Sequence, residues 1–212
     1  MNKKIFVLGS GGHASVLVDI LTQQQKNISG LAGPNEKELR ENLVNLKRYQ
    51  DADLLAFNKD EILLINGIGS IPESSLRLKL YNKFIQLGYL FKSVISSKAI
   101  VSPHAFLGIG VQIMQGAIIQ AGAKIGDNTI INSGAIIDHD CIIGCNNHIA
   151  PGVTLSGQVE SKNNVHFGTG SSVIQSVLIG ENCVIGAGAT ITKDIEDNQI
   201  VYPARVTKKA LK

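Results

Sequence analysis

Every sixth residue from Val101 to Ile191 is large and apolar, with the single exception of Ser161 among sixteen positions. The residue four places after each of these is small or compact, except at Asn147 and Ile195. A helix repeats every 3.6 residues and a strand every two, so neither keeps a six-residue repeat on one face. The pattern therefore predicts a chain that turns a corner every six residues and points one aliphatic side chain inward along each side.

Three such sides make a coil of 18 residues, and coils stack at the spacing of neighbouring strands, roughly 4.8 Å. The register holds without a slip over residues 97–192, which predicts about five coils and a column on the order of 25 Å long. Charge changes at the same place, because residues 1–96 carry 21 charged side chains and residues 97–192 only 8. We therefore predict two domains, residues 1–95 and residues 96–212.

The N-terminal part alternates short apolar runs with segments of helical spacing. These elements predict a small Rossmann-like α/β domain with a parallel sheet. We expect strands at residues 4–8, 61–66 and 89–95, and helices at residues 14–22 and 72–87.

The glycine-rich turn GSGGHA at residues 9–14 joins the first predicted strand to the first predicted helix. Glycines at such a turn let backbone N–H groups approach a phosphate at the helix N-terminus. A dinucleotide-binding domain also needs an acidic residue about 20 positions further on, and residues 28–35 contain none. We therefore reject NAD as the favoured ligand.

The overall composition excludes several classes of partner. The net charge is +3, from 20 Lys and Arg against 17 Asp and Glu, which is too weak to indicate nucleic acid. No apolar run approaches the roughly 18 residues of a membrane span, and the first apolar stretch is too short for a signal peptide. Three cysteines do not suit a disulfide framework and fit a reducing compartment. We therefore expect a cytoplasmic protein without membrane insertion.

Three histidines stand out. His139 precedes Asp140, and a neighbouring carboxylate orients an imidazole and stabilises its protonated form, as a general base near neutral pH requires. A solvated surface pair is the alternative, and contact between adjacent side chains needs a turn at a corner. His148 and His166 are one coil apart. We expect them to stack at one corner, either lining a groove between protomers or forming a surface ladder without a task.

Other chemistry is less well indicated. The histidine spacing does not resemble that of a carbonic-anhydrase-type zinc site, so we expect no metal. Cys141 and Cys183 occupy inward positions, where a thiol packs as a small apolar group. No Ser, Cys or Lys lies in a recognisable nucleophile motif.

The hexads LGIGVQ, IGDNTI, IGCNNH, IGENCV and IGAGAT resemble the repeats of left-handed β-helix acyltransferases. With the N-terminal GSGGHA and the later DHDCIIGCNNHIAPG, the chain is similar to sugar O-/N-acyltransferases over residues 4–205. That family includes sialic acid O-acetyltransferases and UDP-4-amino-sugar N-acetyltransferases. The resemblance implies a left-handed parallel β-helix after the α/β domain, a homotrimer and acetyl-CoA as co-substrate.

The resemblance also implies roles for particular residues. His139 would be the catalytic base with Asp140 as its acidic partner, and His148 would lie at the thioester of acetyl-CoA. Backbone groups for the pantetheine arm are implied at Gly157, Thr169 and Ala187. Substrate contacts are implied at Ser10, Gly12, His13, Gly69 and Asn132, and Arg77 matches an arginine that follows the second glycine turn.

The expected function is therefore acetyl transfer to an amino or hydroxyl group of a nucleotide-linked sugar, with a UDP-4-amino-sugar as the leading candidate. Residues 33–35 lack the aspartate that reads uracil in UDP-sugar members, and the closing motif is altered at residues 201–205. The C-terminal basic residues either attract the coenzyme phosphates or are simply solvated; they are Lys193, Arg205, Lys208 and Lys209. Alternatives are a sialic-acid-type O-acetyltransferase, a γ-type carbonic anhydrase and a non-catalytic trimeric assembly protein.

Overall fold

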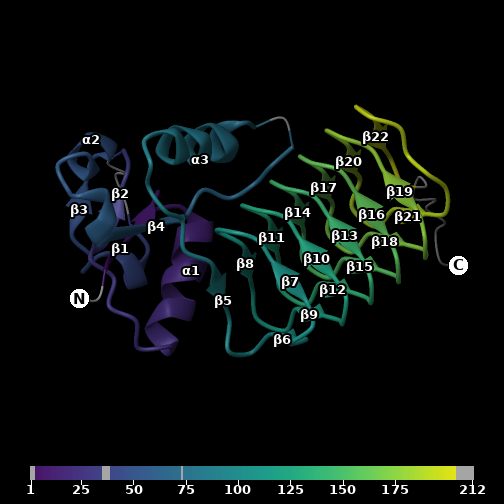
Figure 1. Cartoon of the computed structure of the whole chain (residues 1–212), viewed down its shortest axis with the longest axis horizontal. Helices are drawn as coiled ribbons and strands as arrows, with labels where there is room; N and C mark the ends of the chain where they lie inside the picture. Colours follow the sequence, from purple (N-terminus) through teal and green to yellow (C-terminus); the bar gives the residue numbers. More distant parts are fainter. Residues whose placement is uncertain (1–2, 35–38, 73, 204–212) are drawn as a thin grey trace, which may run out of the picture.

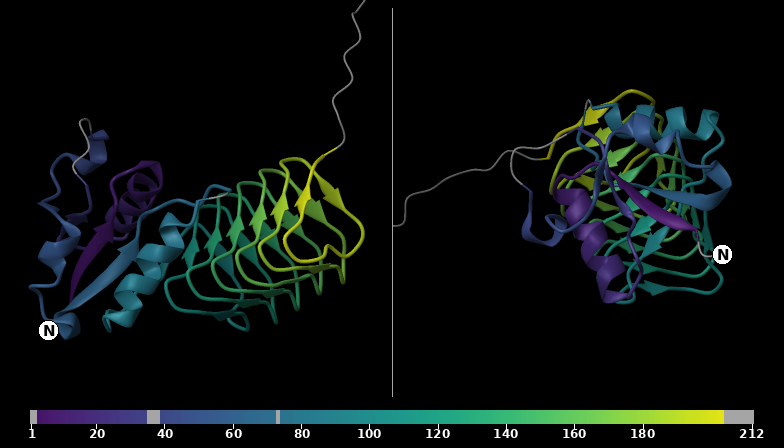
Figure 2. Two further views of the ribbon diagram at one scale, coloured as in Figure 1. Left: turned by 90° about the horizontal axis from the view of Figure 1, so that it is seen from above. Right: turned by 90° about the vertical axis from the view of Figure 1, so that its left-hand side faces the viewer.

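A computed structural model describes residues 3–34, 39–72 and 74–203 of the chain. A small α/β domain packs against one end of a triangular prism of stacked coils (Figures 1 and 2). None of the described helices has the length and apolar character that a membrane crossing requires.

The α/β domain is built on a parallel sheet of four strands in the order β3-β2-β1-β4. Its strands are β1 (Lys4–Leu8), β2 (Gly30–Ala32), β3 (Arg48–Tyr49) and β4 (Ile62–Asn66). Its helices are α1 (Gly12–Gln23), α2 (Asp51–Leu54) and α3 (Leu76–Gln86), with 3₁₀ turns η1 (Glu41–Leu43) and η2 (Lys59–Glu61).

Alternate residues of β1 face opposite sides of the sheet and pack against different helices. Val7 lies in a core cluster with Leu17 and Leu21 of α1, whereas Phe6 lies in a cluster with Phe84 of α3. The α1 cluster also contains Val94 of the first coil, so it joins the domain to the prism.

Three predicted elements of this domain differ from the structure. Helix α1 spans Gly12–Gln23 rather than residues 14–22. Helix α3 begins at Leu76 rather than at residue 72. The predicted strand at residues 89–95 is wrong as a domain strand, because only Phe91 bridges to Leu64 of β4. Val94 and Ile95 instead form β5, the first strand of the prism, since the 18-residue pairing extends back to them.

The prism has three parallel sheets, which the chain visits in turn; we call them the first, second and third sheets. The first contains β5 (Val94–Ile95), β8 (Gln112–Ile113), β11 (Ile130–Ile131), β14 (His148–Ile149), β17 (His166–Phe167), β20 (Val184–Ile185) and β22 (Ile200–Val201). The second contains β6 (Ile100–Val101), β9 (Ile118–Ile119), β12 (Ile136–Ile137), β15 (Thr154–Leu155), β18 (Ser172–Val173) and β21 (Thr190–Ile191). The third contains β7 (Phe106–Leu107), β10 (Lys124–Ile125), β13 (Ile142–Ile143), β16 (Glu160–Ser161) and β19 (Leu178–Ile179).

The predicted left-handed β-helix is confirmed. Paired residues are 18 positions apart, as in His148 with His166, until the last coil, where Val184 pairs with Ile200. The predicted inward side chains from Ile113 to Ile191 are buried. Asn147 and Ser161 are polar residues at interior positions of the six-residue pattern, and they contact each other, since Asn147 Nδ2 donates to Ser161 Oγ at 2.8 Å.

Three kinds of corner separate the sheets, and each is closed by residues with positive φ. The glycine corner, between the first and second sheets, consists of Gly116, Gly134, Gly152, Gly170 and Gly188. The histidine corner, between the second and third sheets, has Gly122, Asp140, Gln158 and Ser176 in this conformation. The asparagine corner, between the third and first sheets, has Gly110, Asn128, Asn146, Asn164 and Asn182.

Candidate active site

The histidine corner forms a hydrogen-bonded imidazole–carboxylate pair. His139 Nδ1 lies 2.9 Å from Asp140 Oδ2, and both side chains are well exposed. Adjacent side chains meet because Asp140 adopts a φ of 59°, which turns its carboxylate back toward the ring. The carboxylate accepts the Nδ1–H, so Nε2 is left with a free lone pair. The predicted contact at a corner is confirmed.

The pKa of His139 is raised above its ordinary value. The hydrogen bond to Asp140 is the main cause, and the negative charges of Asp138 and Asp140 add to it. A raised pKa makes the imidazole a stronger base, which suits the acceptance of a proton from a reacting group near neutral pH.

Gly157 lies directly against the reactive edge of this ring. A Cβ at that position would lie 2.6 Å from both Cε1 and Nε2 of His139. Any larger residue would therefore push the imidazole from its place. Gly157 therefore lies beside His139 and apart from Thr169 and Ala187, which precede glycines of the glycine corner.

His148 and His166 pair on adjacent strands β14 and β17 of the first sheet, rather than at a corner as predicted. Their rings are 4.8 Å apart between centroids, with Nδ1 atoms 3.3 Å apart. Asn132 Nδ2 lies 3.2 Å from His148 Nε2, so Asn132, implied as a substrate contact, lies against His148. His148 is buried and His166 is half-buried, so they do not form two exposed imidazoles.

Burial keeps this pair neutral. The pKa of His148 is lowered to about 3, mainly by desolvation and also by nearby His166, His13 and Arg77, while the hydrogen bond to the Ser70 backbone acts in the opposite direction. Burial also lowers the pKa of His166. Both rings therefore carry one proton each at neutral pH.

The glycine-rich turn brings His13 to the seam between domain and prism. His13 Nε2 lies 2.7 Å from Gln112 Oε1, and Gln112 Nε2 donates to the Asn66 carbonyl at 2.7 Å. Gly69 lies against His13, since a Cβ there would be 3.4 Å from His13 Cβ. Burial lowers the pKa of His13 to about 4, so it contacts the prism as a neutral ring.

The remaining turn residues border the N-terminus of α1. Ser10 is buried and Gly12 is exposed in the first helical turn. No side chain caps this helix N-terminus, so its N–H groups suit a phosphate. Arg40, which the sequence analysis did not single out, lies beside it, with Nη2 3.4 Å from the place of a Cβ on Gly12.

Arg77 is buried at the same seam and acts structurally. Its guanidinium donates to the carbonyls of Asn66, Ile68 and Asn128. Burial lowers its pKa to about 9. It thus ties β4 and the following turn to the asparagine corner.

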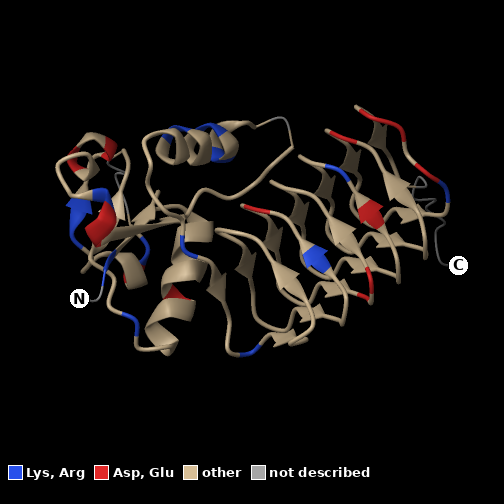
Figure 3. Ribbon diagram, in the orientation of Figure 1, with Lys and Arg blue, Asp and Glu red and all other residues tan. Residues whose placement is uncertain are grey.

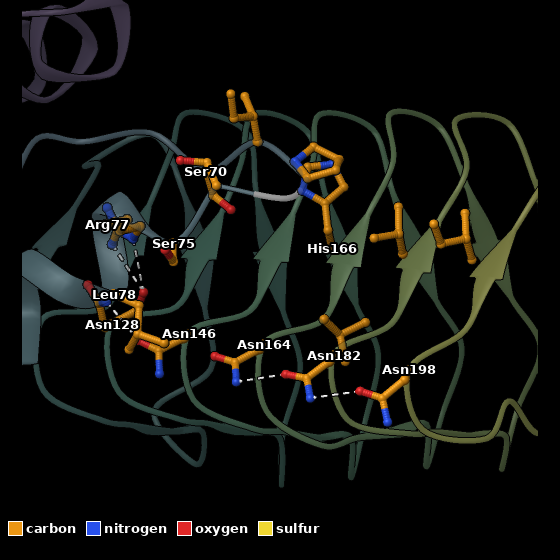
Figure 4. Close-up of a pocket in the computed structure, with 16 residues that line it drawn as sticks. Ser70, Ser75, Arg77, Leu78, Asn128, Asn146, Asn164, His166, Asn182 and Asn198 are labelled. Atoms are coloured by element: carbon orange, nitrogen blue, oxygen red, sulfur yellow. Dashed lines mark hydrogen bonds between the residues drawn. The ribbon is translucent and has the colours of Figure 1, made fainter.

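A groove of about 430 Å³ opens between the prism and residues 70–72 and 74–78. Figure 4 shows His166 and the row of asparagines facing it, with Asn164 donating to Asn182 and Asn182 to Asn198 at 3.1 Å each. The sequence analysis missed this groove, although asparagines recurring at 18-residue spacing were visible in the sequence.

One chain does not bring all the expected residues together. The histidine corner lies between the second and third sheets, whereas His148 projects from the first sheet, on the opposite side of the triangle. Thr169 and Ala187 lie near a third location, the exposed glycine corner. Lys193 is exposed, and Arg205, Lys208 and Lys209 lie outside the described residues. In the described part of the chain, no group of three or more His, Cys, Asp or Glu is placed to hold a metal ion.

Two family models match the chain. The PglD N-terminal domain matches residues 4–84, and the bacterial transferase hexapeptide matches residues 104–139, 122–157 and 162–193. No curated protein sequence gives a significant match.

Solved structures match almost the whole chain. PerB from Caulobacter crescentus, in complex with CoA and GDP-perosamine, is 31% identical with a TM-score of 0.84, and the match covers 97% of each chain. A variant of perosamine N-acetyltransferase from Caulobacter crescentus, also in complex with CoA and GDP-perosamine, is 30% identical with a TM-score of 0.84, and the match covers 97% of each chain. The acetyltransferase domain of PglB from Neisseria gonorrhoeae, in complex with acetyl coenzyme A, is 27% identical with a TM-score of 0.84, and covers 97% of this chain and 99% of its own.

Proposed function

The chain belongs to the left-handed β-helix sugar acyltransferases with a PglD N-terminal domain, and we propose that it transfers an acetyl group from acetyl-CoA to the amine of a nucleotide-linked amino sugar. Its place would be bacterial surface-glycan biosynthesis. We propose the cytoplasm as its location, since its three cysteines are free thiols.

The observation that carries the proposal is the His139–Asp140 pair. Its geometry leaves Nε2 unprotonated, exposed and bordered by the small Gly157. Such a nitrogen can accept the proton of an amine during attack on a thioester, which typically gives ~10²–10⁴-fold acceleration.

The transfer is direct. Acetyl-CoA supplies the acyl group when it is bound. As the sugar nitrogen forms its bond to the acyl carbon, His139 Nε2 takes the proton from nitrogen, and Asp140 stabilises the resulting imidazolium. The bond from carbon to sulfur then breaks, and the same imidazolium can return the proton to the departing thiolate.

The glycine corner fits the coenzyme arm. At Gly152, Gly170 and Gly188 the space that a Cβ would occupy is open. Backbone amides there can be approached closely, as the amide groups of a pantetheine arm require. Both PerB and the PglB domain are described with the coenzyme bound.

We further propose that a homotrimer completes the site, because His139 and His148 lie on different sides of one prism. The strands of the second sheet carry no charged side chain, whereas the third sheet carries Lys124 and Glu160 (Figure 3). Depletion of charge marks the centre of protein interfaces. Packing the second sheet against a second copy would bring one protomer's His139 toward the first sheet and glycine corner of the next.

The sugar nucleotide is proposed to bind at the N-terminus of α1. The uncapped amides of that helix and the neighbouring Arg40 suit a diphosphate. Uracil and guanine are both candidates for the nucleobase of the substrate. The chain lacks the uracil-reading aspartate at residues 33–35, and PerB is described with GDP-perosamine.

A thiol-release assay tests the function. The protein is incubated with acetyl-CoA and a panel of UDP- and GDP-linked amino sugars, together with free sialic-type sugars as O-acetyl acceptors. We expect thiol release with an amino-sugar nucleotide, and a loss of ~10²–10⁴-fold in kcat for His139→Ala with the oligomer intact. A wild-type rate in that variant would remove His139 from its role, and release with the free sugars alone would favour O-acetylation.

A further inference from the structure

The imidazoles of His148 and His166 on the first sheet form a row of hydrogen-bond contacts with the side chain of Asn132. The amide of Asn132 is oriented by Ser133, whose N–H donates to Asn132 Oδ1 at 2.8 Å. Asn132 Nδ2 therefore points at His148 Nε2, 3.2 Å away. On the other side of the ring, His148 Nδ1 faces His166 Nδ1 at 3.3 Å.

These contacts assign a position to each proton, with the Ser70 backbone as the competing acceptor for the proton of His148. An amide NH₂ can only donate, so His148 Nε2 accepts, and the single proton of the neutral ring is on Nδ1. That proton is donated to His166 Nδ1, so His166 in turn carries its proton on Nε2. Hydrogen bonds are therefore donated from Asn132 to His148 and from His148 to His166.

His166 lines the groove between the prism and residues 70–72 and 74–78 (Figure 4). With the protons placed in this way, its Nε2–H is the last donor of the hydrogen-bond chain. The polar lining there is otherwise amide and hydroxyl groups, from Ser70, Asn164 and Asn182 among others. The one charged residue of the lining, Arg77, donates its guanidinium N–H groups to backbone carbonyls. The groove thus suits an uncharged ligand segment rich in oxygen acceptors, and not a phosphate.

We propose that His166 is a positioning residue that fixes the tautomer of His148 and donates its own Nε2–H to an acceptor oxygen of a ligand in this groove. The proposal rests on the proposed function, since it assigns His166 to the same acetyl-transfer site. The oxygen belongs either to a sugar hydroxyl or to an amide of the pantetheine arm, which share this chemistry.

Two substitutions separate the two parts of the role. His166→Asn keeps an acceptor oxygen near the place of Nδ1 but loses the Nε2–H that faces the groove. His166→Phe keeps the ring volume and loses both nitrogens. Val184→Ala, at the position paired with His166 and lining the same groove, is the matched control for a change of groove shape alone.

The tautomer is read by long-range proton–nitrogen NMR of the imidazoles in the intact protein, which needs no activity. We expect His148 to carry its proton on Nδ1 in the wild type and in His166→Asn, and to lose that preference in His166→Phe. A wild-type His148 protonated on Nε2, with its proton directed to the Ser70 backbone, would overturn the proposal even if acetyl transfer is confirmed.

Kinetics identify the ligand. We expect His166→Asn to raise KM by roughly three- to tenfold, the effect of one hydrogen bond, with kcat nearly unchanged. A rise confined to the sugar nucleotide identifies a sugar hydroxyl, and a rise confined to acetyl-CoA identifies the pantetheine arm. Unchanged KM values for both substrates, or equal effects in Val184→Ala, would overturn the groove contact.

Discussion

The hydrogen bond from His139 to Asp140 determines both the direction of the ring and its affinity for a proton. Base catalysis requires the neutral ring, so activity falls as pH decreases through the pKa of His139, which is raised in this structure. Asp140→Asn removes the main cause of that rise. We therefore predict that the acidic limb of the profile of kcat/KM against pH moves to lower pH, with a reduced plateau because the base is weaker.

The measurement is kcat/KM from pH 5.5 to 9 at saturating acetyl-CoA. Asp138→Asn is the matched control, because Asp138 makes a smaller contribution to the pKa and bonds only to the backbone N–H of His139. An acidic limb that stays in place in Asp140→Asn would show that another group titrates.

Gly157 offers a second test at the scale of one residue. Its φ lies outside the left-handed region, so alanine fits the backbone, but the added Cβ would lie 2.6 Å from His139 Nε2. The exposed ring must swing aside, and a displacement of about 1 Å at a reacting group lowers the rate on the order of 10²-fold. We predict that Gly157→Ala loses kcat with thermal stability unchanged. Gln175→Ala, one coil further along the same row, should retain full activity.

The sequence identified the His139–Asp140 pair but could not establish its contact. Alternation of side chains along a strand places neighbours on opposite faces, and only the positive φ of Asp140 brings them together. Gln112 and Arg40 were missed for a different reason. They are brought to the glycine-rich turn by packing between distant segments, which no local pattern encodes.

At the scale of elements, the six-residue period predicted the prism because each hexad is one side of the same triangle. The two polar interior positions, Asn147 and Ser161, follow from the same geometry, since they lie on the same side of adjacent coils, where Asn147 Nδ2 donates to Ser161 Oγ. The last coil departs from the period by two residues, with Val184 paired to Ile200. The end of a repeat has no following coil to hold its register, so the pattern does not constrain it.

The asparagine corner provides a stability test. Asn182 has a φ of 57°, accepts from Asn164 and donates to Asn198. Asparagine tolerates this backbone conformation, whereas alanine is strained there by about 1–2 kcal/mol. We predict that Asn182→Ala lowers the free energy of unfolding by that amount, and that Asn182→Gly lowers it by clearly less because glycine relieves the strain.

Urea denaturation at one fixed protein concentration gives both values, since oligomer stability depends on concentration. Equal losses in the two variants would mean that the side-chain ladder, and not the backbone conformation, selects asparagine at this corner.

At the scale of the whole molecule, the α/β domain packs against one end of the prism, where it buries the outward side chains Gln112, Ile130 and His148 of the first sheet. The seam is held by apolar packing through Val94, by the contact of His13 with Gln112 and by the bond from Arg77 to the Asn128 carbonyl. This arrangement places the glycine-rich turn beside His148, while His139 is on the far corner of the prism. The resemblance supplied the roles of these residues, but only the fold shows that a single chain separates them.

A mixing experiment tests whether subunits share the site. His139→Ala and His148→Asn are each expected to be nearly inactive alone, and each should remain an intact oligomer. When they are co-expressed with different tags, each trimer that contains both variants has a wild-type His139 facing a neighbour's wild-type His148 at about one site in three. We therefore predict that mixed trimers, purified through both tags, recover activity of that order. If each chain held a complete site, every site would lack one histidine and mixing would restore nothing, so an inactive mixture of intact oligomers would refute the shared site while leaving the fold and the His139–Asp140 pair in place.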